Sequence, residues 1–227
     1  MRLRGRKAVV TGGGRGIGRA VAVRFAEEGA HVAVVARTRH ELEETAHAVE
    51  SKGDTALKLP CDVRSADQIE RMAKTCLASF RVIDVLVKNA GVFTEPFGVL
   101  ASPVETYDET FAVNLRAAWV CAKAFAPHMS PDSSIINVTS GLAQGPSPSY
   151  FPYSLSKWGL EGLTRILADA LPQRVNAVDP GLVATRMTDF SGKPPNRVTE
   201  VFVYLASPES KAVRGQVLKA SRFSRPA

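Results

Sequence analysis

The chain has 227 residues, with 29 lysines and arginines against 22 aspartates and glutamates, which gives a formal net charge of +7 at pH 7. This length suffices for one sizeable hydrophobic core and is short for two, so we expect a single domain over residues 1–227. The sequence has no apolar run as long as a membrane span, and its basic N-terminus lacks the apolar segment of an export signal. We therefore expect a cytoplasmic protein without membrane association.

Composition also argues against several kinds of site. The three cysteines, Cys61, Cys76 and Cys121, are scattered in a way that suits reduced, buried thiols. The four histidines have no metal-ligand spacing with them or with carboxylates, so we expect no catalytic metal. The positive charge is diffuse and forms no basic stripe with interleaved aromatics, which argues against nucleic-acid binding. It favours anionic ligands, such as a phosphorylated cofactor or an acidic carrier protein.

The N-terminal segment has the pattern of a strand, a glycine-rich turn and a helix. Glycines at 12–14, 16 and 18 directly follow a short apolar run, and apolar residues then recur at helical spacing up to Gly29. Glycine lets the backbone approach a pyrophosphate closely, and a helix N-terminus offers unpaired N–H groups. Such a run alone could be a surface turn, but in this context it predicts a dinucleotide site. We expect contacts from Gly12, Arg15, Gly16, Ile17 and Gly18.

The end of the second apolar run, residues 31–36, predicts which dinucleotide binds. A dinucleotide fold places this strand end beside the adenosine ribose, where an NAD-preferring protein has Asp or Glu. This chain has Ala36, followed by Arg37 and Arg39, with Arg15 in the glycine-rich turn. The sequence thus predicts no carboxylate that would repel a 2′-phosphate, and guanidiniums that could bind it bidentately. We predict NADP(H); the alternative is that these arginines are merely solvated.

Two further strand ends supply candidate cofactor contacts. Asp62 and Val63 follow the third strand at the carboxyl edge, where open α/β sheets bind ligands. Asp62 could accept a hydrogen bond from an adenine amino group or could cap a turn. Residues 65–68, Ser-Ala-Asp-Gln, then have the pattern of a capping box that begins a helix. The fourth strand is followed by three small residues that permit close cofactor contact or simply a tight turn: Asn89, Ala90 and Gly91.

The residues that could carry chemistry lie in the second half of the chain. Asn114 lies in a predicted long helix, where asparagine is a mediocre helix former. Ser140 follows the fifth predicted strand, and a Pro-, Ser- and Gly-rich loop, 141–152, leads to a helix with Tyr153 and Lys157. Residues four apart lie on one helix face, so the tyrosine and lysine can point into one cleft.

These residue types suit the reduction of a carbonyl. Hydride addition builds negative charge on oxygen, which must be stabilised and protonated. A free tyrosine has a pKa of about 10, but a nearby ammonium and the positive nicotinamide of the oxidised cofactor lower it. We predict that Tyr153 exchanges the proton, Lys157 lowers its pKa and holds the nicotinamide ribose, and Ser140 hydrogen-bonds the substrate oxygen. The Tyr-x-x-x-Lys spacing is specific only because it coincides with Ser140, the loop and the cofactor turn.

Helical patterns alternate with short apolar runs along the whole chain, and neither a linker nor an internal repeat interrupts them. This alternation predicts an α/β fold of the Rossmann type, with a doubly wound parallel sheet of about seven strands and helices on both faces. The predicted strands are Val9–Thr11, Val32–Ala36, Ala56–Leu59, Val82–Val87, Ser134–Val138, Val175–Val178 and Gln216–Leu218.

In their order along the chain, these motifs resemble those of single-domain short-chain dehydrogenase/reductases. The matching pieces cover almost the whole chain: Thr11-Gly-x-x-x-Gly-x-Gly18, Asp62-Val63, Asn89-Ala-Gly91, Asn114, Ser140, Tyr153-x-x-x-Lys157 and Pro180-Gly-Leu-Val-Ala-Thr185. The resemblance implies a catalytic tetrad in which Tyr153 is the acid–base and Asn114 holds a water that relays protons. It also implies cofactor contacts from Pro180, Gly181, Val183 and Thr185, the last two with the nicotinamide carboxamide.

The chain departs from the family pattern at four places. Lys88 stands where an asparagine is usual, and the connection at 171–174 is shorter than typical. Only about residues 187–195 separate the nicotinamide loop from the last predicted helix, 196–205. After Leu218 the usual acidic-glycine ending is absent. These departures affect substrate closure and the C-terminal subunit contact, while the tetrad is intact.

The resemblance implies an NADPH-dependent reductase of a small-molecule carbonyl, similar in pattern to 3-oxoacyl-thioester reductases, with a substrate that can be linked to an acyl carrier. One alternative is an alcohol, sugar or steroid dehydrogenase of the same family, and another is an NADP-binding regulator without turnover.

The resemblance also implies a homo-oligomer, a tetramer or a dimer, because in this family the helices at about 108–126 and 153–171 pair across a two-fold axis. Trp119, Phe125 and Trp158 supply apolar area for such a contact, although burial within the monomer explains them nearly as well.

Overall fold

Seven parallel strands form one sheet in the order β3-β2-β1-β4-β5-β6-β7 in the computed structural model, which describes residues 1–53 and 55–224. The order reverses between β1 and β4, and ligands of open α/β sheets bind at such a reversal. The predicted doubly wound, Rossmann-type sheet is confirmed. The strands are β1 (Lys7–Thr11), β2 (His31–Ala36), β3 (Ala56–Pro60), β4 (Val85–Lys88), β5 (Ser134–Val138), β6 (Arg174–Asp179) and β7 (Val217–Lys219).

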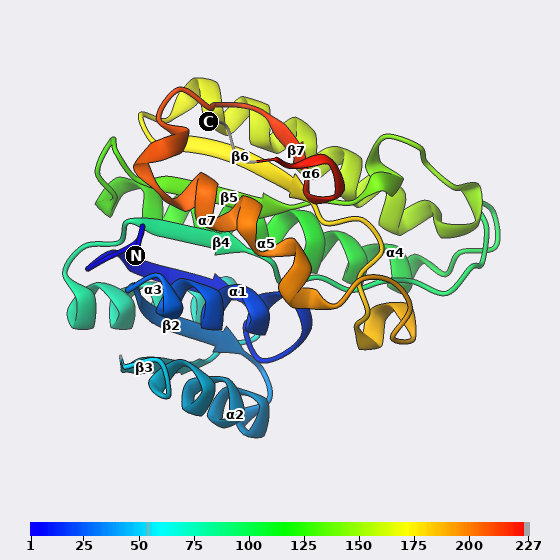
Figure 1. Cartoon of the computed structure of the whole chain (residues 1–227). Coiled ribbons are helices and arrows are strands. Elements are labelled where there is room, and N and C mark those ends of the chain that lie inside the picture. The colour runs from blue at the N-terminus through cyan, green and yellow to red at the C-terminus, as the bar shows by residue number, and fades with distance from the viewer. Residues whose placement is uncertain (54, 225–227) are drawn as a thin grey trace.

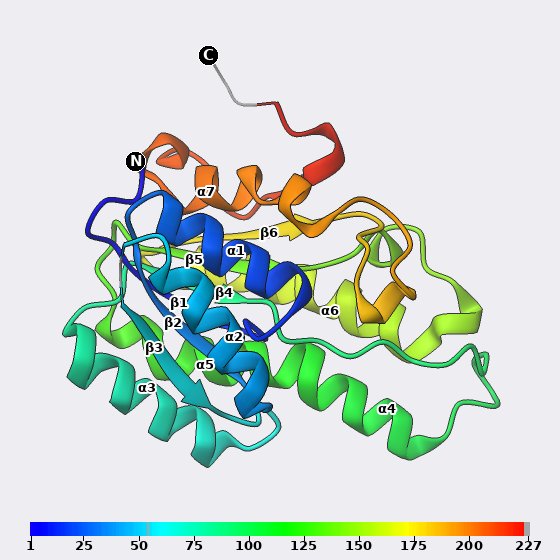
Figure 2. The same ribbon diagram turned by 60° about the horizontal axis from the view of Figure 1, so that its bottom comes forward.

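Helices cover both faces of this sheet (Figures 1 and 2). One face carries α1 (Gly16–Glu27), α2 (Arg39–Glu50) and α7 (Glu200–Ala206), and the other carries α3 (Ala66–Phe80), α5 (Ala117–Phe125) and α6 (Phe151–Ala170). The remaining α-helix of the described residues, α4 (Val104–Phe111), extends α5 beyond the sheet. None of the described helices has the length and apolar character that crossing a membrane requires.

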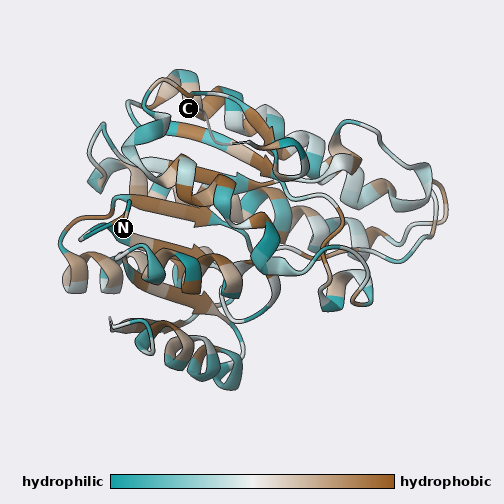
Figure 3. Ribbon diagram, viewed as in Figure 1, coloured by the Kyte–Doolittle hydropathy of each residue, from teal (hydrophilic) through white to brown (hydrophobic). Residues whose placement is uncertain are grey.

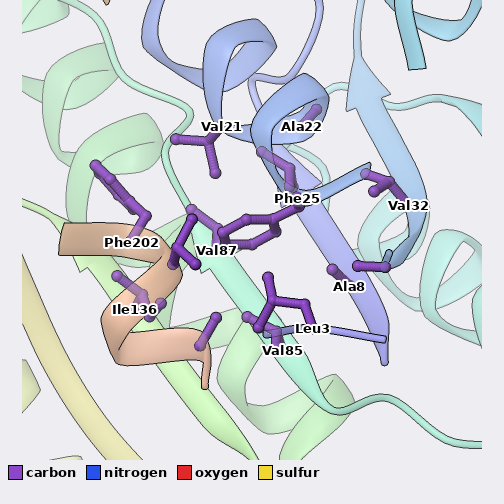
Figure 4. Close-up of a cluster of buried hydrophobic side chains, with 14 of the residues drawn as sticks. Leu3, Ala8, Val21, Ala22, Phe25, Val32, Val85, Val87, Ile136 and Phe202 are labelled. Atoms are coloured by element: carbon purple, nitrogen blue, oxygen red, sulfur yellow. The ribbon is translucent and has the colours of Figure 1, made fainter. Parts of the chain in front are cut away.

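The strands are apolar on both sides because helices bury both faces, as Figure 3 shows for the central strands. Successive residues point to opposite faces: Val10 belongs to the core under α1 and α7, and Val9 to the core under α3 and α5. Phe25 of α1 is fully buried at the centre of the first core, where it lies between Val87 and Val32 (Figure 4).

Three elements differ from the sequence prediction by more than one or two residues, or in kind. The fourth strand begins at Val85 rather than Val82, since the Asp84 carboxylate instead accepts a hydrogen bond from the Lys7 N–H, at 2.7 Å. The long helix predicted over 108–126 begins earlier, at Val104, and contains one π-helical turn, Ala112–Arg116. The last helix is divided into a 3₁₀ turn, Pro195–Val198, and α7.

The capping box at residues 65–68 forms only in part. The Ser65 hydroxyl accepts a hydrogen bond from the Gln68 N–H at 3.3 Å, as predicted. The Gln68 side chain does not return to the backbone of Ser65; it accepts from the Asp62 N–H at 2.9 Å. The helix start is thereby tied to the strand end that carries Asp62, which fixes the loop at the carboxyl edge of the sheet.

Candidate active site

Hydrogen bonds join the carboxyl ends of β1 and β4, where the sheet order reverses. The Thr11 hydroxyl accepts from the backbone N–H groups of Asn89 and Ala90, at 3.0 and 3.2 Å, and donates to the Val87 carbonyl at 3.3 Å. The Asn89 amide donates to the carbonyls of Thr11 and Gly12, both at 3.0 Å. Asn89 therefore fixes the glycine-rich turn, residues 12–18, against β4. The sequence analysis described it only as a small residue at a strand end.

The glycine-rich turn leaves the start of α1 open to an anion. Gly12 and Gly16 have φ angles of +62° and +54°, and a Cβ on Gly12 would lie 2.8 Å from the Ala90 Cα. In the described part of the chain, no side chain caps the first N–H groups of α1, and its first turn holds no acid. Ile17 points the other way and packs against the core. This turn fits the pyrophosphate of a dinucleotide.

The ribose end of the crevice contains a carboxylate that the sequence analysis missed. Ala36 ends β2 as predicted, and Arg37 is exposed beside it. However, Glu41 lies in the first turn of α2, and its Oε1 is 3.4 Å from Arg15 Nη1. The strand end itself carries no acid, as expected, but the first turn of α2 brings a carboxylate beside the glycine-rich turn. An acid is favoured in the first turn of a helix, so a helix start near residue 39 would have been the available signal.

The carboxylate of Asp62 is hydrogen-bonded to Arg64. Arg64 donates from Nε and Nη2 to both Asp62 oxygens, at 2.6 to 3.1 Å, and the Arg64 backbone N–H also donates to Oδ1. These bonds, the Arg64 side chain first among them, hold the pKa of Asp62 below its usual value despite partial burial. Of the two roles that the sequence left open, capping a turn is the one this geometry shows. Val63 beside it is buried.

At the other end of the crevice, Ser140, Tyr153 and Lys157 come together. Ser140 follows β5; its hydroxyl accepts a hydrogen bond from the Leu142 N–H at 3.2 Å and acts on the Tyr153 side chain, whose pKa it lowers. Lys157, four residues along α6, places Nζ 5.7 Å from the centre of the Tyr153 ring and donates to the Val138 carbonyl at 2.8 Å. A Cβ on Gly91 would lie 3.5 Å from that Nζ. Gly91 therefore lies directly beside the lysine.

Asn114 lies in the π-helical turn, and its side chain is fully engaged. Its Oδ1 accepts from the Val92 N–H at 2.9 Å, and its Nδ2 donates to the Val92 carbonyl and to Ser156 Oγ, both at 3.0 Å. Ser156 was missed by sequence reasoning, although it precedes Lys157 directly. π-Helical turns often mark functional sites because they displace backbone groups from regular helical bonding. The role predicted for Asn114, holding a water, stays a prediction.

Burial dominates the protonation of Tyr153 and Lys157. It raises the pKa of Tyr153, and the hydrogen bond from Ser140 only partly opposes that effect. Burial likewise lowers the pKa of Lys157 from 10.5 to about 8. The chain alone therefore does not lower the tyrosine pKa as predicted. The cost of removing the phenolate from water exceeds any stabilisation by the Lys157 ammonium, which donates its hydrogen bond to the Val138 carbonyl.

Phe93 is a second residue that sequence reasoning missed. Its ring lies 4.7 Å from the Tyr153 ring in an edge-to-face arrangement and 4.8 Å from the Tyr150 ring. Such pairs stabilise by roughly 0.5–1.5 kcal/mol beyond the area they bury. Its place shortly after Asn89–Gly91 was the only available signal. Phe93 forms an apolar wall beside the tyrosine.

The segment after β6, residues 182–198 and hereafter the lid, contacts the glycine-rich turn. A Cβ on Gly16 would lie 3.2 Å from the Thr185 side chain. Val183 is buried and pairs with Lys193, which closes the lid on itself. Before the lid, Gly181 has φ +70° and its N–H donates to Asp179 at 2.9 Å, next to the buried Pro180. Of the four nicotinamide-loop residues named from sequence, Thr185 lies against the glycine-rich turn, and the cofactor contacts of all four stay predictions.

Comparison with known proteins agrees with this arrangement. A family model described as short chain dehydrogenase matches residues 6–195. The chain belongs to the short-chain dehydrogenase family. Over 190 residues it is 34% identical to a 3-oxoacyl-acyl-carrier-protein reductase of Staphylococcus aureus, covering 81% of this chain and 77% of that protein.

Two solved structures of this family carry different cofactors. A short-chain dehydrogenase from Burkholderia cenocepacia in complex with NADP superposes with a TM-score of 0.90 at 28% identity, covering 96% of this chain and 97% of that one. An NAD⁺-bound xylitol dehydrogenase superposes with a TM-score of 0.91 at 25% identity, with coverage of 96% and 98%. The family thus binds nicotinamide cofactors of both kinds.

Lys88, which replaces the asparagine usual in the family, is a buried amine below the crevice. It is 4% exposed, and its Nζ donates to the Ala118 carbonyl at 3.1 Å. It lines a small cavity between β4, the π-helical turn and α5, together with Thr11, Val63, Ala90, Val113, Asn114, Ala117, Ala118 and Cys121. Burial lowers the pKa of Lys88 from 10.5 to about 8, and Cys121 opposes this slightly.

Within the described residues, no group of three His, Cys, Asp or Glu could hold a metal.

Replacing Lys88 by Met should stabilise the protein at pH 7. The pKa of Lys88 is lowered on folding, so between pH 8 and 10.5 the unfolded chain binds more protons and stability rises with pH. The full penalty of the buried charge is present below pH 8. We expect Lys88→Met to raise the free energy of unfolding at pH 7 by about 1–3 kcal/mol and to weaken the rise above pH 8, as measured by urea unfolding. The pKa of Lys157 is also lowered to about 8, so the unfolding free energy of the variant should still rise above pH 8 because of that lysine.

The matched control is Lys58→Met, because Lys58 is an exposed lysine paired with Glu43. It should change the unfolding free energy by less than about 0.5 kcal/mol. A Lys88→Met protein that is less stable at pH 7 and keeps the full pH dependence would contradict this account.

Proposed function

We propose that the chain is an NADPH-dependent reductase of a small ketone, with residues 1–227 acting as one NAD(P)-binding domain. The observation that carries this proposal is the meeting of Ser140, Tyr153 and Lys157 at the far end of the crevice that the glycine-rich turn begins. One end offers free helix N–H groups for phosphate, and the other offers a hydroxyl pair beside an amine. A nucleotide-binding regulator would not require that second end.

The roles follow from the contacts of each side chain. A nicotinamide, when bound, supplies the hydride. Tyr153 gives its proton to the substrate oxygen, and the Ser140 hydroxyl, which acts on the Tyr153 side chain, holds the same oxygen. Lys157 has three donors and uses one of them on the Val138 carbonyl, which leaves the others for a ribose hydroxyl. Asn114 keeps the π turn in shape through Val92 and Ser156, so that its main chain can hold a proton-relaying water.

The cofactor proposal is NADP(H). It is supported by Ala36 where a carboxylate would select NAD, by Arg37, which follows it in the chain, and by Arg15 in the glycine-rich turn. The proposed contacts are Gly12, Arg15, Gly16, Ile17, Gly18, Arg37, Asp62, Val63, Asn89, Ala90, Gly91, Tyr153, Lys157, Pro180, Gly181, Val183 and Thr185.

The substrate proposal is a ketone with an apolar flank, including a 3-oxoacyl thioester on an acyl carrier. Phe93 and Tyr150 form an aromatic pair beside Tyr153, and two lid residues, Leu182 and Met187, are 61% and 41% exposed. Apolar surface of this kind near the reacting group favours an aliphatic or aromatic substituent over a sugar. The similarity to a 3-oxoacyl-acyl-carrier-protein reductase supports the same class.

We also propose a homo-oligomer, a dimer or a tetramer, in the cytoplasm. An apolar groove runs between α5 and α6, and beside it Trp119, Trp158 and Ile166 are 49%, 64% and 65% exposed. Phe125, which the sequence analysis placed with this surface, is instead fully buried in the monomer core. Large exposed apolar patches mark interaction sites. Free, buried cysteines suit a reducing compartment.

Light scattering at micromolar concentration tests the assembly. We expect a mass of two or four chains, and Trp119→Glu with Trp158→Glu should convert it to one chain, because buried unpaired charge is costly. Glutamate at Leu100, which is fully exposed far from this groove, is the control. A monomer in the unmodified protein would refute the proposal.

Cofactor preference should depend on residues 36 and 37. We expect NADPH to bind more tightly than NADH, and Ala36→Asp with Arg37→Ile to narrow or reverse the difference, since the aspartate repels a 2′-phosphate and accepts from a 2′-hydroxyl. Fluorescence titration gives both dissociation constants. Equal constants in the unmodified protein are the result that this proposal does not allow.

Catalysis should fail at Tyr153 while the cofactor still binds. Tyr153→Phe removes one hydroxyl, so NADPH affinity should persist while turnover of a ketone such as an acetoacetyl thioester falls by about 10²-fold or more. Ser140→Ala should lower turnover only, and Lys157→Ala should lower both turnover and NADPH affinity. NADPH consumption against a panel of ketones measures this. If Tyr153→Phe kept near-normal turnover, the proposed proton donor would be wrong.

A further inference from the structure

Two guanidiniums from distant parts of the chain contact one carboxylate oxygen beside the glycine-rich turn. Arg15 Nη1 lies 3.4 Å and Arg186 Nη1 lies 3.2 Å from the same atom, Glu41 Oε1. The Glu41 side chain is only 15% exposed, whereas Arg15 and Arg186 are 54% and 64% exposed. The anion is therefore the fixed member of this triad, and both cations approach it from the solvent.

The surroundings hold Glu41 in this position. A Cβ on Gly14 would lie 3.0 Å from the Glu41 Cβ, so the first turn of α2 packs directly on the glycine-rich turn. Arg186 also acts on Glu44, one turn further along α2: the pKa of Glu44 is lowered mainly by its hydrogen bond with Arg19, and Arg186 contributes. The lid is thus joined to α2 by charge as well as to the glycine-rich turn through Thr185.

We propose that Glu41 and Arg186 set the selectivity of this chain for a 2′-phosphate. Glu41 competes with the 2′-phosphomonoester of an adenine dinucleotide for Arg15, and Arg186 reduces that competition because it binds the same carboxylate oxygen. The inference rests on the proposed NADP(H) site. It adds two specificity-determining residues, one of them in the lid, that neither the strand end at Ala36 nor the glycine-rich turn contains.

The competition follows from the charges. A phosphomonoester carries between one and two negative charges near neutral pH and three acceptor oxygens, so it attracts a guanidinium more strongly than a carboxylate does. The pair of Arg15 with Glu41 is exposed on the arginine side, and exposed pairs are weak, so Arg15 can exchange partners. Without Arg186, however, Glu41 would bind Arg15 alone and would leave its full negative charge beside the incoming phosphate.

Four proteins test this as a double-mutant cycle: the unmodified chain, Glu41→Gln, Arg186→Met and the double variant. Dissociation constants for NADPH and NADH are measured by fluorescence titration at constant ionic strength. Glu41→Gln should tighten NADPH binding about threefold to tenfold and change NADH binding little. Arg186→Met should weaken NADPH binding by a similar factor. In the Glu41→Gln background, Arg186→Met should have no further effect, because the competing anion is gone.

Matched controls separate this effect from general charge. Glu43→Gln makes the same change on the same helix at a residue paired with Lys58, and Arg197→Met removes another exposed lid cation. Both should leave the ratio of the two dissociation constants unchanged. The rise in melting temperature caused by adenosine 2′,5′-bisphosphate, relative to 5′-AMP, gives a second readout that also reports whether each variant is folded.

Several outcomes would overturn the proposal. One is an unchanged NADPH affinity in folded Glu41→Gln protein. Another is an Arg186→Met effect that persists in the Glu41→Gln background, since Arg186 would then bind the cofactor directly. The cycle needs no ketone, so it is independent of turnover. Equal NADPH and NADH affinities in the unmodified chain would refute the cofactor proposal alone, while a selective gain in Glu41→Gln would still support the role of Glu41.

Discussion

The hydroxyl of Thr11 and the amide of Asn89 hold together the two strand ends between which everything else is arranged. Between them they make five hydrogen bonds that join β1 and the glycine-rich turn to β4 and the segment that follows it. This junction lies where the sheet order reverses, so helices on opposite faces diverge from it and leave a crevice. This junction positions both ends of the crevice, the phosphate end and the end that holds Tyr153.

Regular structure could be predicted well from sequence because its cause is local. Strands such as β2 are continuous apolar runs, and the glycines and the spacing of Tyr153 and Lys157 are visible as letters. What could not be predicted depends on partners far away in the chain. Arg186 meets Glu41 across 145 positions, and Asn114 meets Ser156 across 42. Phe125 and Trp119 share one helix, and only the packing shows which faces the core.

The protonation of the site was the other limit of sequence reasoning. Spacing shows that a lysine is near a tyrosine, but not how far each is removed from water. Here dehydration acts on both, raising the pKa of Tyr153 and lowering that of Lys157. The chain alone therefore holds the tyrosine as a neutral acid beside a readily deprotonated amine. Further positive charge at the site would be required to favour the phenolate.

The phosphate end has inner residues that cannot be substituted and outer residues that can. A Cβ on Gly18 would lie 2.2 Å from the Gly12 carbonyl oxygen, and one on Gly13 2.9 Å from that of Val10; both are backbone atoms that have no room to yield. Around them, Arg37 and Arg186 project into solvent. Random mutagenesis with selection for altered coenzyme use should therefore recover changes at this rim and almost none at the inner glycines.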